Sequence, residues 1–324
     1  MAGRRFNASL HGLGLLLPRN GWLSALALRD FNVHGNVFQP PDSCRFAVQR
    51  RQFAVISGKR TIAELCSWKG VRPVPVLTAY DYTMARLLDE AGVPLMLVGD
   101  SVGMVVLGYP NTTHVTVDEM VHHVRAVARA KTRALIGGDM PYRSYETPTQ
   151  ALETAQRLIE AGAEYVKAEG GVEILPQIEA IRTAGIPFMA HLGMLPQHVV
   201  EEGGKYTIKG RDEDGRAKLL SDALTLEKAG AFACVLELVT PPVAEEMTKA
   251  CTKMLTIGIG SGPGCDGQVL VTHDLAGAFP WFTPRFVKPR AKTGEDLRRV
   301  AREWMAEMGC QQELATVDAQ GSIA

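Results

Sequence analysis

The sequence predicts an α/β protein built as one (β/α)₈ TIM barrel with an N-terminal extension. From about residue 61 to residue 309, eight short apolar runs alternate with amphipathic stretches. Several runs are dense in Val, Ile and Leu without alternation, which is typical of strands buried on both faces of a parallel sheet. A barrel needs about 250 residues, which this stretch supplies. The alternative is an open, doubly wound sheet, because the number of strands alone does not distinguish it from a closed barrel.

The predicted strands and helices follow one another in order along the chain. The runs expected to form strands are residues 74–77, 95–98, 134–136, 165–166, 187–190, 233–236, 255–259 and 269–271. Helices are expected at 81–91, from 116 onward, and at 147–161, 217–230 and 241–253. Thr116 and Glu119 have the spacing of a capping box, and Pro148 suits a first helical position. Gly162 is a typical helix stop.

Composition divides the chain into three parts. Residues 1–55 are rich in Arg, and Asp30 and Asp42 are the only acids before residue 60. An acid-poor, Arg-rich start predicts a mitochondrial targeting segment, with a disordered extension of a cytoplasmic protein as the alternative. Residues 56–309 form the predicted barrel, and residues 310–324 a C-terminal tail.

Charge and hydropathy argue against nucleic acid and membranes as partners. The 35 Lys and Arg residues balance 35 Asp and Glu residues, so no excess of positive charge favours a polyanion. No apolar stretch reaches the roughly 18 residues needed to span a bilayer. The six cysteines form no CxxC pair and no zinc-binding pattern, and we interpret them as reduced.

Five consecutive apolar runs are followed by ionisable residues. In order, these are Asp100, Asp139, Lys167 with Glu169, His191 and Glu237. Any one of them could be a helix cap or a turn former. Five in succession indicate more, because the carboxyl ends of barrel strands meet at one rim, where the active sites of such barrels lie. Buried charges at that rim are costly unless they are paired or bind a metal.

Three of these residues, Asp100, Asp139 and Glu169, offer only carboxylate oxygens. Oxygen atoms are the ligands that Mg²⁺ prefers, with waters and substrate oxygens completing its octahedron. No cysteine accompanies them, and His191 is the only nearby imidazole. The set therefore predicts a Mg²⁺ site rather than a Zn²⁺ site.

Glu237 and Lys167 suggest further chemistry at the same rim. Glu237 follows a strongly apolar run, so desolvation should raise its pKa and suit it to act as a general base near neutral pH. A structural salt bridge is its alternative role. Lys167 would bring positive charge to an anionic ligand, or pair with Asp139 or Glu169, and the two roles can coexist.

Two loops complete the predicted site. Residues 193–216 are long, charged and glycine-bearing, which predicts a lid over the rim or, alternatively, a disordered surface loop. Residues 258–264 contain four glycines. Such a loop can cradle phosphates or carboxylates with backbone N–H groups, but we favour a close approach of backbones.

Seven short motifs resemble those of the ketopantoate hydroxymethyltransferase family. They are TAYDY at residues 78–82, LVGDSVGM at 97–104, GDMPY at 138–142, VKAEGG at 166–171, HLG at 191–193, SDAL at 221–224 and DGQVL at 266–270. The resemblance extends from about residue 61 to residue 308, and the order of the motifs makes it specific.

The resemblance implies a (β/α)₈ barrel of the phosphoenolpyruvate/pyruvate type. Its expected reaction transfers a hydroxymethyl group from 5,10-methylenetetrahydrofolate to 3-methyl-2-oxobutanoate. The product, 2-dehydropantoate, lies on the pathway to pantothenate and coenzyme A. The resemblance also implies a homo-oligomer, commonly a decamer.

The resemblance also implies roles for the rim residues. Mg²⁺ would be bound by Asp100 and Asp139, with Glu169 among the same ligands. The expected contacts of the oxo acid are Asp100, Ser101, Asp139, Lys167 and His191. Glu237 matches the position of the proton acceptor.

The lid departs from the family pattern. Members usually carry an apolar or aromatic residue before Gly-Gly, where this chain has Glu201 and Glu202, and residues 205–211 form a run one residue longer. We expect this difference to affect how the lid closes and how it contacts the folate.

One rival function is an isocitrate-lyase-like, Mg²⁺-dependent carbon–carbon lyase, but residues 193–216 lack the cysteine typical of the lid in those enzymes. A non-catalytic binding barrel is the other rival, and the full set of rim residues argues against it.

Overall fold

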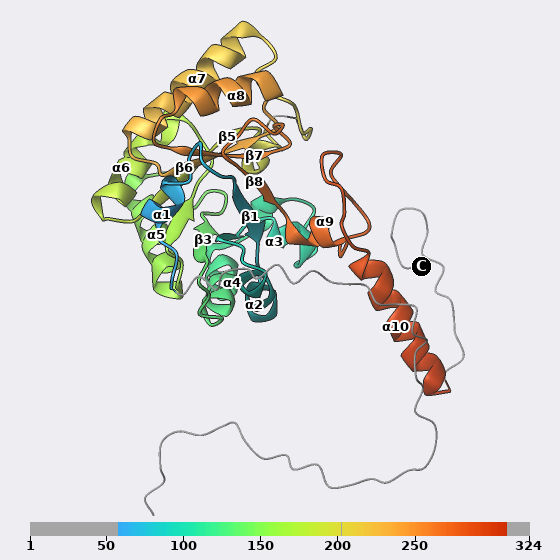
Figure 1. Cartoon of the computed structure of the whole chain (residues 1–324). Coiled ribbons are helices and arrows are strands. Elements are labelled where there is room, and N and C mark those ends of the chain that lie inside the picture. Colours follow the sequence, from blue (N-terminus) through green and yellow to red (C-terminus); the bar gives the residue numbers. More distant parts are fainter. Residues whose placement is uncertain (1–57, 202, 310–324) are drawn as a thin grey trace, which may run out of the picture. The chain divides into compact units, whose positions relative to one another are not determined.

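The computed structural model describes residues 58–201 and 203–309, and eight parallel strands there form a closed barrel in sequence order (Figure 1). The last strand pairs with the first, Val74 lying beside Gly267. All eight predicted strands are confirmed, and closure excludes an open doubly wound sheet. The predicted targeting segment, 1–55, and the tail, 310–324, lie outside the described residues.

The strands are short and lie close to their predicted positions. They are β1 (Val74–Thr78), β2 (Leu95–Val98), β3 (Leu135–Asp139), β4 (Tyr165–Lys167), β5 (Phe188–Gly193), β6 (Ala233–Glu237), β7 (Leu255–Ile259) and β8 (Gly267–Leu270). Most of their residues are buried on both faces, which is why these segments are apolar without alternation.

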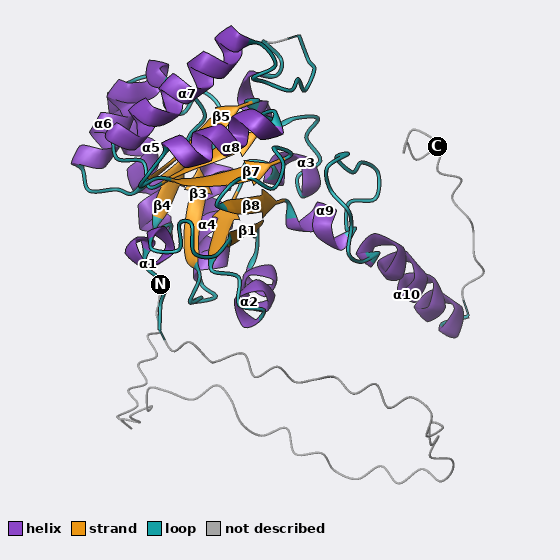
Figure 2. Ribbon diagram, turned by 45° about the horizontal axis from the view of Figure 1, so that its top comes forward, coloured by secondary structure: helices purple, strands orange, loops and turns teal. Residues whose placement is uncertain are grey.

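The described residues form ten α-helices, most of which lie around the outside of the strands (Figure 2). They are α1 (Ile62–Cys66), α2 (Tyr82–Glu90), α3 (Val102–Val105), α4 (Val117–Ala128), α5 (Pro148–Ala161), α6 (Leu175–Thr183), α7 (Glu213–Lys228), α8 (Pro241–Ala250), α9 (Thr272–Ala276) and α10 (Thr293–Glu307). Short 3₁₀ turns are η1 (Thr112–His114), η2 (Val172–Ile174) and η3 (Pro196–His198).

The helix ends follow the sequence signals. Thr116 and Glu119 form the predicted capping box of α4. Thr147 caps α5, which ends at Gly162 with a left-handed φ of 111°. The prediction was wrong at α7, which begins at Glu213 rather than at residue 217, because the Asp212 side chain accepts a hydrogen bond from Gly215 N and caps the helix there.

Two apolar clusters hold the barrel together. One fills its interior with strand side chains such as Leu95, Tyr165 and Met189. The other lies between the strands and the helices and includes Met120 and Leu158. Tyr165 crosses the interior and donates to the Met96 carbonyl at 3.0 Å. A Cβ at Gly137 would lie 2.1 Å from the Tyr165 ring, so only glycine fits there.

The final helix differs from the others, because no residue of α10 is buried. Leu297, Val300, Trp304 and Met308 recur on one face and are 45–67% exposed. None of the described helices combines the length and apolar character that a membrane crossing requires. Cys234 is fully buried, and the four cysteines within the described residues are free thiols.

Candidate active site

One cavity of about 1100 Å³ at the carboxyl ends of the strands brings together every rim residue predicted from the sequence. Its lining includes Asp100, Ser101, Asp139, Lys167, Glu169, His191 and Glu237. These side chains follow five different strands, so barrel closure alone gathers them. Four of them, Asp139, Lys167, Glu169 and His191, are at most 4% exposed.

Asp100 and Asp139 are neighbours at the ends of β2 and β3. The backbone N–H of Asp100 donates to Asp139 Oδ2 at 3.1 Å. Lys167 Nζ lies 3.1 Å from Asp139 Oδ1, an ion pair that the sequence had suggested. Burial raises the pKa of Asp139 to about 7 against the opposing effect of Lys167. Burial alone would lower the pKa of Lys167, but the surrounding carboxylates outweigh it and raise that pKa, so the ammonium is charged.

Glu169 is turned toward β5 and η3. Its Oε2 accepts a hydrogen bond from Gln197 N at 2.9 Å, and its Oε1 lies 3.5 Å from His191 Nδ1. Within residues 58–201 and 203–309, no three His, Cys, Asp or Glu side chains hold their donor atoms close enough to share one metal ion. The three predicted carboxylates therefore line one cavity without forming a ready-made three-ligand site.

Gln197, which sequence reasoning missed, connects the acids. Its amide NH₂ donates to Asp100 Oδ2 at 2.8 Å and to the Met140 carbonyl at 2.9 Å, and its Oε1 accepts from Tyr145 at 2.6 Å. Gln197 is 1% exposed. A buried amide with both donors and its acceptor satisfied fixes the position of the carboxylate that it binds.

Replacing Gln197 by Met is expected to destabilise the protein by about 1–3 kcal/mol, because buried polar groups of Tyr145, Met140 and Asp100 lose their partner. Urea denaturation measures this change. Gln156→Met on the exposed side of α5 is the matched control. Equal free energies of unfolding for the two variants would mean that the hydrogen bonds of Gln197 do not stabilise the protein.

His191 lies between the acids and Glu237. Burial, reinforced by Lys167, lowers the pKa of His191 well below its usual value, so the ring is neutral. Lys167 Nζ lies 3.4 Å from Nδ1. An ammonium only donates, so Nδ1 accepts and Nε2 carries the proton. That Nε2 lies 3.3 Å from Glu237 Oε2 and has no hydrogen-bond partner in this structure.

Glu237 ends β6 and is the least enclosed carboxylate of the group, with 14% of its side chain exposed. Burial raises its pKa to about 7, partly offset by Lys167. The raised pKa predicted for this residue is therefore confirmed. A carboxylate with a pKa near neutrality is suited to accept a proton in the physiological pH range.

Ser101 is held by an aromatic neighbour. Its Oγ lies 2.8 Å from the hydroxyl of Tyr80, which is fully buried. The Tyr80 carbonyl is in turn 2.8 Å from His123 Nδ1, so His123 has a structural role. The Ser101 hydroxyl faces the cavity from a fixed position.

The two predicted loops both reach the cavity. β5 extends through Gly193, η3 follows, and α7 begins at Glu213, so the irregular part of the proposed lid is shorter than predicted. Tyr206 and Ile208 from this loop line the cavity. In the glycine-rich turn, a Cβ at Gly260 would lie 2.7 Å from the Leu238 side chain, so side chains pack directly against the backbone of the turn there.

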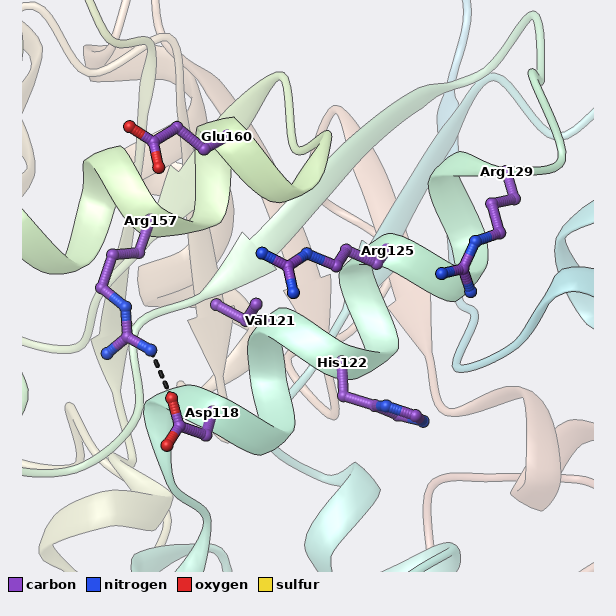
Figure 3. A pocket seen from close by; sticks show the side chains of 7 residues that line it. All are labelled: Asp118, Val121, His122, Arg125, Arg129, Arg157 and Glu160. Atoms are coloured by element: carbon purple, nitrogen blue, oxygen red, sulfur yellow. Dashed lines mark hydrogen bonds and ion pairs between the residues drawn. The ribbon is translucent and has the colours of Figure 1, made fainter. Parts of the chain in front are cut away.

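A second hollow of about 440 Å³ lies on the outside of the barrel (Figure 3). It is lined by Asp118, Val121, His122, Arg125, Arg129, Arg157 and Glu160, from α4 and α5. Arg157 pairs with Asp118. None of the residues predicted at the rim lines this hollow, so the chemistry belongs to the cavity inside the barrel mouth.

Solved structures of other proteins share this fold. Phosphonopyruvate hydrolase in complex with oxalate and Mg²⁺ superposes with a TM-score of 0.56 at 14% identity, covering 81% of this chain and 95% of that one. The phosphoenolpyruvate phosphomutase of Streptomyces platensis subsp. rosaceus gives a TM-score of 0.55 at 14% identity, covering 81% and 96%. These similarities show that the chain shares the barrel fold of those proteins.

Sequence relatives identify the family. The family model for ketopantoate hydroxymethyltransferase matches residues 59–312. The 3-methyl-2-oxobutanoate hydroxymethyltransferase of Pyrobaculum calidifontis is 50% identical over 251 residues, 77% of this chain and 94% of that protein. The enzyme of the same name from Oleidesulfovibrio alaskensis is 50% identical over 234 residues, 72% and 80% of the two chains. The chain therefore belongs to the ketopantoate hydroxymethyltransferase family.

Proposed function

We propose that this protein transfers a hydroxymethyl group from 5,10-methylenetetrahydrofolate to 3-methyl-2-oxobutanoate and forms 2-dehydropantoate, a precursor of pantothenate. Its relatives carry the name of that activity. The observation that carries the proposal is the position of Glu237. This carboxylate has a pKa raised to about 7 and shares one cavity with the buried ammonium of Lys167. That combination suits removal of a proton from a small anion.

The residues present fit a Mg²⁺ ion held by Asp100 and Asp139. In proteins Mg²⁺ is usually bound by one or two carboxylates and keeps waters and substrate oxygens. Asp139 Oδ1 is buried, and its partner among the described residues is the Lys167 ammonium 3.1 Å away, so the carboxylate already holds a cation at this position. Among the described residues Lys167 is the only buried Lys or Arg, so the carboxylates around it outnumber the positive charges. Bound there, Mg²⁺ would supply positive charge against the charge that develops on a keto oxygen during enolisation.

The chain's own residues divide the remaining work. The Lys167 ammonium attracts the carboxylate of the oxo acid, and the Ser101 hydroxyl offers it a hydrogen bond. The C3–H bond of the oxo acid breaks, and its proton passes to Glu237. The neutral His191 lies beside Glu237, with its Nε2 3.3 Å from Oε2, and adds no positive charge that would lower the pKa of that carboxylate.

The overall reaction balances without a redox partner. C3 of the oxo acid bonds to the methylene carbon of the folate, whose bonds to nitrogen break. Water supplies the hydroxyl oxygen of the product, and tetrahydrofolate leaves. The apolar walls from Val235, Ile259 and Val269 limit the access of other water to the enolate.

A single assay tests the function against its rivals. The protein is incubated with 3-methyl-2-oxobutanoate and ¹³C-methylene-labelled tetrahydrofolate, and ¹³C in 2-dehydropantoate is measured by mass spectrometry. An isocitrate-lyase-like enzyme would instead cleave a hydroxy acid without folate. A binding barrel would form no product and would not exchange the C3 proton. Absence of labelled product under saturating Mg²⁺ contradicts the proposed function.

We also propose that the protein assembles as a homo-oligomer through α10. Its apolar face has no partner among the described residues, and a large exposed apolar patch is typical of an interface. The outward positions of β1 and β8 are incompletely covered too, with Pro75 and Gln268 exposed. Helices normally cover the outer face of such strands. A second copy of the chain would cover these surfaces.

Trp304→Glu is expected to dissociate the oligomer, because it places a charge in the apolar face of α10. Ala306→Glu adds the same charge on the opposite face of the helix and should leave assembly intact. Light scattering after size-exclusion chromatography measures both masses. Dissociation of both variants, or of neither, would exclude the apolar face as the contact.

The Arg-rich residues 1–55 are proposed to direct the protein to mitochondria, on composition alone. A fusion of these residues to a fluorescent protein should be imported and shortened. Replacing their Arg residues by Gln should leave the fusion in the cytoplasm. A diffuse signal from the unmodified fusion would contradict the proposed targeting.

A further inference from the structure

Asp274 in α9 is a buried carboxylate that the proposed mechanism leaves unused. The residue is 7% exposed and lines the same cavity as Glu237. Within residues 58–201 and 203–309 its carboxylate makes no hydrogen bond or ion pair, and burial is what shifts its pKa. A buried carboxylate without partners is costly. A ligand that donates hydrogen bonds to it would remove that cost.

The immediate surroundings of Asp274 provide no compensating positive charge. The preceding residue, His273, lies against Tyr80 with ring centroids 5.4 Å apart, and burial lowers its pKa, so the ring is neutral. Burial raises the pKa of Asp274 itself to about 6, which leaves it ionised at neutral pH. Tyr80 in turn contacts Ser101, so Asp274 lies close to the end of the cavity that holds the oxo acid.

The wall beside Asp274 is aromatic. Phe279, Phe282 and Phe286, from the segment that follows α9, line the cavity, and Phe282 is 58% exposed. Flat ring systems stack on such side chains. The cavity, at about 1100 Å³, is slightly larger than pockets that enclose a drug-sized ligand and far exceeds the needs of a five-carbon oxo acid. The aromatic end is therefore suited to a second, larger and planar molecule.

We infer that Asp274 binds the pterin ring of the one-carbon donor by accepting hydrogen bonds from its N3–H and its 2-amino group. This assignment rests on the proposed function, which requires a reduced folate. The 2-amino-4-oxopyrimidine edge presents two parallel N–H donors, which match the two oxygens of one carboxylate. The pterin is neutral, so it satisfies Asp274 without a cation, and its faces lie against the phenylalanine wall.

The charges along this wall also determine which end of the folate enters the cavity first. Asp274 lies inside, while Arg285 lines the cavity and is exposed to solvent. A folate carries its N–H donors on the pterin and its carboxylates on the glutamate tail. The pterin therefore enters first, and the tail remains near Arg285 at the mouth. This orientation places the methylene carbon between the pterin and the oxo acid.

The test compares Asp274→Asn with wild type and with Asp214→Asn. Asp214 lies in the first turn of α7, as Asp274 lies in the first turn of α9, but is exposed. Binding of tetrahydrofolate is measured by calorimetry, and C3–H exchange of the oxo acid without folate by NMR in heavy water. Asp274→Asn should weaken folate binding roughly 10- to 100-fold. It should leave C3–H exchange unchanged, and Asp214→Asn should change neither.

A tetrahydrofolate analogue lacking the 2-amino group tests the same contact from the ligand side, even if the variant fails to fold. Wild type should bind the analogue more weakly than tetrahydrofolate, whereas Asp274→Asn should not distinguish the two. Unchanged folate affinity in Asp274→Asn, equal affinity of wild type for both ligands, or parallel loss of C3–H exchange would overturn the assignment. A wild type that binds folate but neither exchanges C3–H nor forms product would instead refute the proposed function.

Discussion

Glu237→Gln is expected to stop exchange of the C3 proton of 3-methyl-2-oxobutanoate while leaving the oxo acid bound. The amide keeps the size of the side chain but cannot accept the proton. General base catalysis typically contributes a factor of about 10²–10⁴, so exchange into heavy water, followed by ¹H NMR, should slow by that factor. Calorimetry should give an unchanged affinity for the oxo acid.

The pH dependence of exchange gives a second readout of the same base. Glu237 must be ionised to accept a proton, and burial raises its pKa to about 7. The wild-type rate of C3–H exchange should therefore fall as the pH drops through about 7. The residual exchange rate of Glu237→Gln should not show this fall. Glu179→Gln on the exposed side of α6 is the control. Near-wild-type exchange in Glu237→Gln would assign the base elsewhere.

Asp100→Ala is expected to weaken binding of the divalent cation by at least about 10–100-fold, because even residues that only orient metal ligands contribute that much. Mn²⁺ can replace Mg²⁺ as the probe, and electron paramagnetic resonance measures its binding without turnover. The activity of the variant should require correspondingly more Mg²⁺.

Loss of Asp100 should also change its neighbour. The negative charge of Asp100 contributes to the raised pKa of Asp139, so that pKa should fall in the variant. Asp118→Ala on the outside of α4 removes a carboxylate far from the cavity and serves as the control. If Asp100→Ala bound Mn²⁺ as tightly as wild type does, Asp100 would have no place among the metal ligands.

Much of the barrel could be predicted because each strand is signalled locally. A strand buried on both faces must be apolar over most of its length, and the residue that ends it at the rim can be polar, as at Asp139 and Glu237. The starts of α4 and α5 could also be predicted, because the side chains of Thr116 and Thr147 each accept a hydrogen bond from a backbone N–H three residues further on. The start of α7 was less clear, since Glu213 and Asp214 gave no apolar periodicity.

The parts of the site that escaped prediction depend on contacts between distant residues. Gln197 is 97 positions from Asp100, and no local pattern marks an amide after β5 as a partner for that carboxylate. Asp274 follows an apolar run, like the other acids, but its burial depends on the packing around α9. The orientation of Glu169 toward Gln197 likewise follows from three-dimensional packing, which spacing along the chain does not encode.

Closure of the barrel has a consequence for the newly made chain. Val74 pairs with Gly267, and Thr272 N donates to Thr78 Oγ1 at 3.0 Å. The seam cannot form until β8 has left the ribosome, so a growing polypeptide keeps two open sheet edges until that point. Pairings between residues so far apart form slowly. Until then the unpaired edges stay exposed, and chaperones must shield them from aggregation.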